Sequence, residues 1–305
     1  MNLDPMPPDL VAPLRSAPPL RLSRWGLPFI RAISALALRQ RILPGVSVRN
    51  AREGAARVRV YTPAAPPVGG LLWIHGGGLV IGRPEWTDAR CARLARDLRV
   101  VVAAARYRLA PQNPFPAGLD DVQSAWGWLL QHAEGLGIAP ERLAVGGESA
   151  GGGLAAALAQ RLRDQGRPQP AAQLLIYPML DDRTAARADI PPEAHEVWNN
   201  ANNHFGWSSY LGAEPGGDAA PPYAVPARTA DLSGLPPAWI GVGTRDLFLE
   251  EDRAYAHRLR EAGVEVVLHE VPGAWHGFPA VAPEAETTRA FIAAQVAYLR
   301  DRIGA

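Results

Sequence analysis

From about residue 46 to its end, the chain alternates short apolar segments with longer segments of helical periodicity. Strands that are apolar throughout are typical of a parallel sheet covered by helices on both faces. The alternation therefore predicts an α/β fold with a mostly parallel central sheet. We expect strands at 57–61, 70–74, 100–105, 143–145, 173–177, 238–242 and 264–271, and helices at 87–97, 119–133, 151–164, 250–262 and 284–303.

Two segments do not follow this alternation. Residues 181–231 are rich in Pro, Ala, Asn and Asp and contain no clear strand. Because a structureless loop of this length is uncommon inside a compact domain, we expect an inserted cap there. Near the N-terminus, Trp25, Phe29, Ile33 and Leu36 recur at helical spacing. They predict an amphipathic helix over 22–43, whose apolar face should cover the protein core rather than a lipid surface.

A serine motif lies between the strand expected at 143–145 and the helix expected at 151–164. Its sequence is Gly147-Glu148-Ser149-Ala150-Gly151. Glycines two positions before and after a serine permit the sharp strand-to-helix turn that presents a nucleophilic hydroxyl, because larger side chains there would clash. We therefore predict that Ser149 is a nucleophile and that Gly147 and Gly151 support its turn.

A second motif, His75-Gly76-Gly77-Gly78, closes the strand expected at 70–74. Consecutive glycines allow backbone N–H groups to converge on one point, as stabilisation of an oxyanion requires. A phosphate-binding loop is the alternative, but neither G-x-G-x-x-G nor a Walker lysine follows. We expect His75 to brace this loop.

A serine nucleophile needs a base and an acid. His276 follows an expected strand and a turn, and Asp246 follows the preceding expected strand. Loops at the carboxyl ends of strands are where α/β sheets carry their chemistry. We predict Asp246 and His276 as acid and base, although Asp246 could also cap the next helix. Asp181 and Asp182, after another strand, are the alternative acids.

Composition excludes several kinds of protein. The formal net charge is +1, which gives no reason to expect a nucleic-acid partner or stable membrane association. The chain has no lysine, so a Schiff-base mechanism is excluded. Cys91 is the only cysteine, which excludes an intrachain disulfide and a cysteine zinc cluster and is consistent with a cytoplasmic protein. We expect neither metal nor cofactor.

Taken together, these motifs resemble the hormone-sensitive-lipase-like (bacterial family IV) esterases and lipases of the α/β-hydrolase superfamily. The likeness runs from about residue 58 onward and also includes Tyr107-Arg108-Leu109-Ala110-Pro111 and Pro272-Gly273-Ala274-Trp275-His276-Gly277-Phe278. Two positions depart from the usual family pattern. Glu148 replaces an aspartate before the serine, and Leu247 replaces a proline after the acid.

The resemblance implies an oxyanion hole formed by the N–H groups of Gly77, Gly78 and Ala150. It also implies N-terminal cap helices at 1–45 and a catalytic domain at 46–305, with a cap insertion at about 181–231. The expected reaction is hydrolysis of short- to medium-chain acyl esters through an acyl-enzyme, with a small-molecule ester as the partner. Candidate pocket-lining aromatics are Trp86, Trp198, Phe205 and Trp207.

Alternatives remain open at this point. An amidase or deacetylase could use the same serine mechanism, and a non-catalytic small-molecule receptor could use the same fold. A haloalkane or epoxide hydrolase is disfavoured, because it needs a carboxylate where Ser149 stands. The apolar segment 264–271 could be a sheet edge that pairs with a second subunit, which would make a homodimer.

Overall fold

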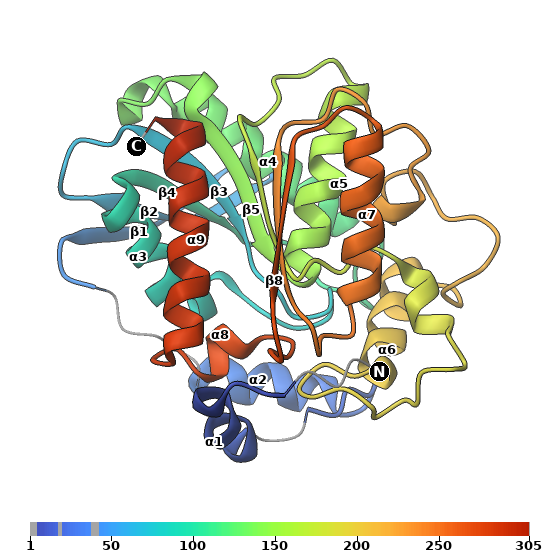
Figure 1. The fold of residues 1–305 in the computed structure, drawn as a ribbon. Coiled ribbons are helices and arrows are strands. Elements are labelled where there is room, and N and C mark those ends of the chain that lie inside the picture. Colours follow the sequence, from blue (N-terminus) through green and yellow to red (C-terminus); the bar gives the residue numbers. More distant parts are fainter. Residues whose placement is uncertain (1–4, 18–19, 38–42, 305) are drawn as a thin grey trace.

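The computed structural model describes residues 5–17, 20–37 and 43–304. Within them, eight strands form one sheet in the order β1-β2-β4-β3-β5-β6-β7-β8, and neighbouring strands from β4 to β8 are parallel (Figure 1). β2 is antiparallel to both β1 and β4. The strands are β1 (Val46–Glu53), β2 (Ala56–Pro63), β3 (Gly69–Ile74), β4 (Val100–Ala105), β5 (Leu143–Glu148), β6 (Gln173–Ile176), β7 (Ala238–Gly243) and β8 (Val266–Val271).

Helices cover both faces of the sheet, which confirms the predicted α/β architecture. α3 and α9 lie on one face of the sheet, and α4, α5 and α7 lie on the other (Figure 1). The described helices are α1 (Pro8–Ser16), α2 (Leu27–Ala37), α3 (Asp88–Leu98), α4 (Ala117–His132), α5 (Ala150–Asp164), α6 (Asn200–Leu211), α7 (Leu249–Glu261), α8 (Phe278–Val281) and α9 (Glu286–Ile303).

The sheet separates two hydrophobic cores. All six residues of β3 are buried, and they alternate between the two sides. Leu71 and Trp73 belong to the core shared with α3 and α9, whereas Leu72 and Ile74 belong to the core shared with α4, α5 and α7. This two-sided burial explains why the central strands are apolar at every position.

All seven expected strands are present, but β1 was not predicted from the sequence. Most of its residues are at least partly exposed, and it carries Arg49, Arg52 and Glu53. An edge strand of this kind has no apolar run by which it could be recognised.

The segment 181–231 contains α6 and short 3₁₀ turns, and none of its residues lies in a strand. Asn199 caps the start of α6 by accepting the N–H of Asn202, and Gly212 ends the helix in the left-handed conformation. The side chain of Asn202 also bonds to the backbone of Leu20 and Leu22. The N-terminal segment therefore contacts α6 directly, and α1, α2 and α6 gather at one end of the sheet (Figure 1). The division into cap and catalytic domain stays a prediction.

The expected packing of the N-terminal amphipathic helix is wrong. α2 begins at Leu27 instead of residue 22 and is described as far as Ala37, while residues 38–42 lie outside the described residues. Trp25, Phe29 and Ile33 are all more than 65% exposed. The helix is instead held by Leu27, which is buried, and by Arg31, which donates to the carbonyls of Val80 and Ala110. Residues four apart share a helix face, so the exposed apolar residues lie on one side of α2 and the anchoring residues lie on another. The side chain of Leu36 lies outside the described residues.

No described helix combines the length and the apolar character that crossing a membrane requires.

Candidate active site

Ser149 occupies a strained turn between β5 and α5. Its backbone angles are φ 55° and ψ −123°, a region that residues other than glycine rarely adopt. The two flanking glycines are required by close backbone contacts. A Cβ on Gly147 would lie 2.4 Å from the carbonyl oxygen of Gly151, and one on Gly151 would lie 2.1 Å from that of Ile74. The turn is completed by the N–H of Ser149, which donates to Ile176.

The loops after β7 and β8 bring Asp246 and His276 to this turn. Nε2 of His276 lies 3.0 Å from Oγ of Ser149, and Nδ1 lies 2.8 Å from Oδ2 of Asp246. The other carboxylate oxygen of Asp246 accepts the N–H of Phe248, just before α7. The carboxylate of Asp246 thus bonds both to the imidazole and to the backbone just before α7.

Aromatic side chains surround the imidazole of His276. Ring centroids of Tyr177 and Phe248 lie 4.7 and 5.1 Å away, both edge-on, and that of Trp198 lies 6.3 Å away. Ser149 and His276 are each only 5% exposed. Tyr177 and Phe248 were not among the residues predicted from the sequence, although each follows the end of a strand in the same way as Asp246.

The glycine motif after β3 leaves two backbone donors free. Gly77 has φ 120° and Gly78 has φ 57°, values that favour glycine. The carbonyl of Gly77 accepts the N–H groups of Val80 and Ile81, which closes the loop. Among the described residues, none accepts a hydrogen bond from the N–H of Gly77 or Gly78. Ala150 opens α5, where the first N–H groups have no partner within the helix.

His75, at the start of this loop, is anchored by Tyr107. It is buried and stacks on Tyr107 at a centroid distance of 4.3 Å, and the hydroxyl of Tyr107 donates to the carbonyl of His75. Burial lowers the pKa of His75 to about 4, despite the hydrogen bond to Gly76, so the ring is neutral near pH 7. Gly76 lies against Ser149, since a Cβ on it would be 3.3 Å from that of the serine.

The four candidate pocket aromatics occupy different places. Trp198 lies beside His276, and a Cβ on Gly78 would be 2.1 Å from its ring. Trp207 borders an apolar cavity of about 10 Å³ next to Ala150. Phe205 packs partly buried on the core that contains α5, and Trp86 borders a separate cavity with Glu148.

Trp198 is held in place by its neighbours. The carboxylate of Glu196 pairs with the guanidinium of Arg245 at 2.5 Å, which links the segment before Trp198 to the residue before Asp246. Val197 has φ 61°, a conformation that is unusual for a β-branched residue. This short segment is therefore constrained on both sides of the candidate site.

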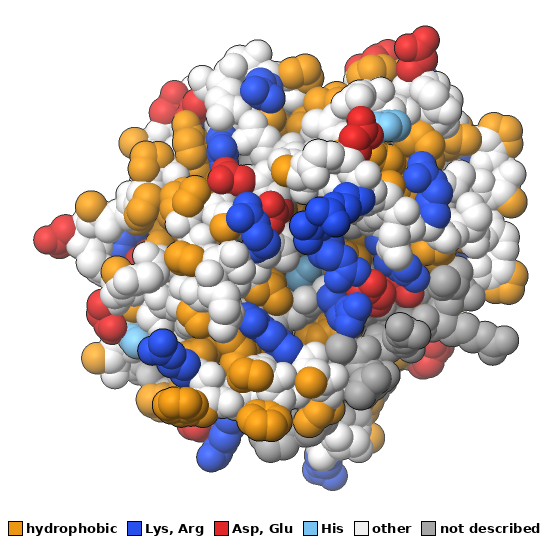
Figure 2. Space-filling model, turned by 180° about the vertical axis from the view of Figure 1, so that it is seen from behind, with side chains coloured by type: hydrophobic (Ala, Val, Ile, Leu, Met, Phe, Trp, Pro, Cys, Tyr) orange, Lys and Arg blue, Asp and Glu red, His pale blue; other side chains and the backbone are white. Residues whose placement is uncertain are grey.

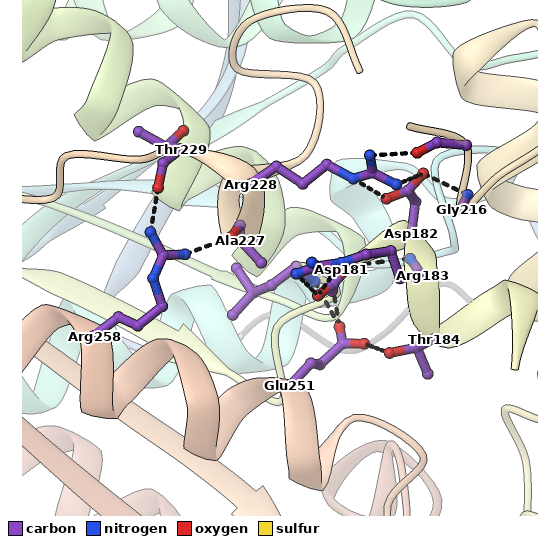
Figure 3. A network of polar contacts seen from close by, with 12 residues as sticks. Asp181, Asp182, Arg183, Thr184, Gly216, Ala227, Arg228, Thr229, Glu251 and Arg258 are labelled. Atoms are coloured by element: carbon purple, nitrogen blue, oxygen red, sulfur yellow. Dashed lines mark hydrogen bonds and ion pairs between the residues drawn. The ribbon is translucent and has the colours of Figure 1, made fainter. Parts of the chain in front are cut away.

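The alternative acids, Asp181 and Asp182, bind arginines instead of a histidine (Figure 3). Asp181 pairs with Arg183 at 2.6 Å, and Asp182 pairs with Arg228 at 2.7 Å. Both belong to a network that joins the segment 181–231 to α7.

Glu251, on α7, is the centre of that network (Figure 3). Its carboxylate accepts the N–H groups of Leu180 and Asp181 and the hydroxyl of Thr184. Burial raises its pKa well above the usual range, although these hydrogen bonds oppose the shift. About two turns further along α7, Arg258 donates to the carbonyls of Ala227 and Thr229, near the C-terminal end of the segment 181–231.

Comparisons with known proteins agree with this geometry. A model of the α/β-hydrolase fold family matches residues 71–280. Ethyl acetate hydrolase from Pseudomonas putida is 38% identical over 226 residues, which cover 72% of this chain and 70% of the relative.

Solved structures extend the likeness to nearly the whole chain. A bacterial heroin esterase is 37% identical with a TM-score of 0.89, and the match covers 98% of both chains. An esterase of the bacterial hormone-sensitive lipase family is 29% identical with a TM-score of 0.81, covering 98% of this chain and 99% of that one. The chain is an enzyme, a carboxylic ester hydrolase of the serine type, and it belongs to the hormone-sensitive-lipase-like esterases of the α/β-hydrolase fold family.

Proposed function

We propose that Ser149, His276 and Asp246 form the catalytic triad, with short- to medium-chain acyl esters as substrates. The observation that carries this proposal is the continuous hydrogen-bond chain from Asp246 through His276 to Ser149, with distances of 2.8 and 3.0 Å. In such a chain the carboxylate holds the imidazole in one tautomer, with Nε2 free to accept the proton of the serine.

The reaction begins when Nε2 of His276 takes the proton of Oγ of Ser149, which attacks the ester carbonyl carbon. The negative charge on the carbonyl oxygen is stabilised by the N–H groups of Gly77, Gly78 and Ala150. The C–O bond then breaks, and the alcohol leaves with the proton from His276. Water hydrolyses the acyl-enzyme by the same steps, with His276 again as base, and releases the acid.

The preference for shorter acyl chains is supported by the small space around the nucleophile. The apolar cavity beside Ala150 measures about 10 Å³ and is bounded by Trp207 and Tyr210. Trp198 covers Gly78 and restricts the other side. The name of the relative that hydrolyses ethyl acetate is consistent with this preference.

Hydrolysis of p-nitrophenyl esters from acetyl to palmitoyl tests the proposal. We expect turnover of the shorter esters by the wild type, and a fall in kcat of roughly 10⁶ in Ser149→Ala. Retention of the rate by Ser149→Ala would exclude this serine as nucleophile. Hydrolysis of the matching anilides but not of the esters would favour the amidase alternative.

We further propose that helices 1–45 and the insertion at 181–231 form a cap over the catalytic domain, because Asn202 joins the two segments. A homodimer could form at β8, which is paired on one side only by β7 in the described sheet and exposes Val267. A monomeric mass by light scattering at micromolar concentration would contradict the dimer.

A cytoplasmic location suits the lone buried thiol of Cys91, and cell fractionation would test it.

A further inference from the structure

A pocket separate from the candidate active site borders the His75 loop, and none of the proposed triad residues lines it. It has a volume of about 500 Å³ and is lined by residues of β2, of the loops after β3 and β4, and of α4. Figure 2 shows basic side chains gathered around a hollow near the middle of this face. The pocket's basic and aromatic lining comprises Arg57, Arg83, Arg106, Arg108, His75 and Tyr107, and one carboxylate, that of Asp121, also lines it.

The arginines of this pocket are only partly neutralised. Glu85 pairs with both Arg83 and Arg106, and Asp121 pairs with Arg108 at 2.8 Å. Arg57 forms no ion pair or hydrogen bond through its side chain with any residue that the structure describes. Four guanidinium groups and two carboxylates leave two positive charges unbalanced.

Arg57 is exposed and faces a second arginine across the hairpin of β1 and β2. It lies directly opposite Arg52 in the antiparallel pairing of β1 and β2. Like charges at such positions destabilise the ladder, and Arg57 has no described carboxylate to offset the repulsion. A negative group in the pocket would offset the repulsion between the guanidinium groups of Arg52 and Arg57.

We propose that this pocket binds a small organic dianion, in which phosphate or paired carboxylate oxygens are held by Arg57, Arg106 and their neighbours. Guanidinium groups bind both kinds of oxyanion in a bidentate manner, and a cleft lined by one sign of charge concentrates the opposite sign. The volume exceeds that of the anion itself, so a group attached to it can lie against the ring of Tyr107.

A ligand in this pocket would contact the base of the loop that carries Gly77 and Gly78. His75 and Gly82 line the pocket, and Gly82 packs so closely on His75 and Gly76 that a Cβ would lie 2.5 Å and 2.3 Å from them. Ser149 does not line the pocket. The ligand should therefore change kcat without competing with the ester, a consequence that rests on the proposed function.

Isothermal titration calorimetry of the full chain with inorganic phosphate tests the binding itself. We expect one site with a millimolar or lower dissociation constant, weakened about tenfold in Arg57→Gln, which loses a charge-assisted contact. Arg167→Gln removes the same charge from an exposed position outside the pocket and should bind as the wild type does. Circular dichroism melts of both variants establish that they are folded.

Absence of phosphate binding up to about 50 mM, together with absence of malonate binding, would overturn the proposal, as would equal weakening in the two variants. Tighter binding of malonate than of phosphate would assign the pocket to dicarboxylates, and the reverse would assign it to phosphate esters. In p-nitrophenyl acetate hydrolysis, purely competitive inhibition by the anion would overturn a separate site. These binding readouts do not require catalytic turnover, so failure of the esterase proposal would leave them interpretable.

Discussion

At the scale of single residues, Asp246 and Asp181 form a matched pair, because they follow the ends of the neighbouring strands β7 and β6. Only Asp246 contacts His276, whereas Asp181 pairs with Arg183. We expect Asp246→Asn to lower kcat by about 10⁴, because the amide no longer favours the productive tautomer of the imidazole. Asp181→Asn should stay within about twofold of the wild type. Equal losses in p-nitrophenyl acetate hydrolysis would contradict the choice of acid.

Trp198 and Trp86 form a second pair, both predicted from the sequence as pocket aromatics. Trp198 lies against Gly78 and near His276, whereas Trp86 borders a different cavity. Trp198→Ala should therefore raise the ratio of kcat/KM for octanoate to that for acetate by about tenfold, because additional methylene groups can be buried. Trp86→Ala should leave this ratio unchanged. An equal change of this kcat/KM ratio in both variants would show that the acyl-chain preference does not depend on Trp198.

The side chains that could be predicted from the sequence are those with a chemical signature and a fixed position relative to a strand. Ser149, Asp246 and His276 each follow a strand end, and parallel strands bring such ends together. Trp86 and Trp198 could not be distinguished in this way, because neither directly follows a strand and their positions depend on contacts with elements distant in the sequence. The role proposed for Arg57 was missed for a related reason: the other residues that line its pocket come from other elements.

At the scale of elements, the nucleophile turn depends on the close packing of α5 against β3. Gly151→Ala would place a Cβ 2.1 Å from the carbonyl oxygen of Ile74 and 2.6 Å from that of His75. Backbone atoms cannot move as flexible side chains do, so we expect the free energy of unfolding to fall by about 1–3 kcal/mol.

Gly127→Ala is the control, because Gly127 also lies in a helix, α4, but a Cβ added there would have no neighbouring atom within 4 Å. Alanine should stabilise this exposed helix position by up to about 1 kcal/mol. Urea unfolding of the two variants measures both changes. If Gly151→Ala were as stable as Gly127→Ala, the turn would be more adaptable than its contacts indicate.

Elements were predicted well where burial imposed a pattern. The buried strands β3 and β4 were found almost to the residue, but the exposed β1 was not. α6 has caps at both ends, yet its interior is polar and its periodicity weak, so its sequence resembles that of a loop. For α2 the helix was predicted but its packing was not. Helical periodicity identifies an apolar face, but it does not say whether that face packs on the protein core, and here the apolar side chains are exposed.

At the scale of the whole molecule, buried acids make stability depend on pH. Glu251 and Asp252 are adjacent on α7, and burial raises the pKa of both well above the usual range. No described residue hydrogen-bonds to either carboxylate oxygen of Asp252. Because the folded state holds these protons more tightly than the unfolded chain does, their contribution to stability is complete below about pH 4 and is lost as the pH rises through the folded pKa values.

Other groups act in the opposite direction over part of this range. Burial lowers the pKa of His75 from its ordinary value of 6.5 to about 4 in the folded state. The contribution of neutral His75 to the free energy of unfolding is therefore lost as the pH falls from 6.5 toward 4. The stability of the wild type alone therefore mixes opposing effects. The difference between the wild type and Asp252→Asn removes the contribution of His75, because that residue is present in both proteins.

Asp252→Asn should match the wild type near pH 4, where both side chains are neutral, and gain about 1–3 kcal/mol relative to it by pH 8. The gain arises because unfolding releases the Asp252 proton at higher pH, which favours the unfolded wild type, or because the folded wild type has to ionise a buried carboxylate. Asparagine has no such proton to release. Urea unfolding at intervals between pH 4 and pH 8 measures it, and Glu250→Gln, an exposed position on the same helix, gives the reference response. A difference that does not grow with pH, or that grows no more than in Glu250→Gln, would mean that Asp252 is not protonated in the folded protein.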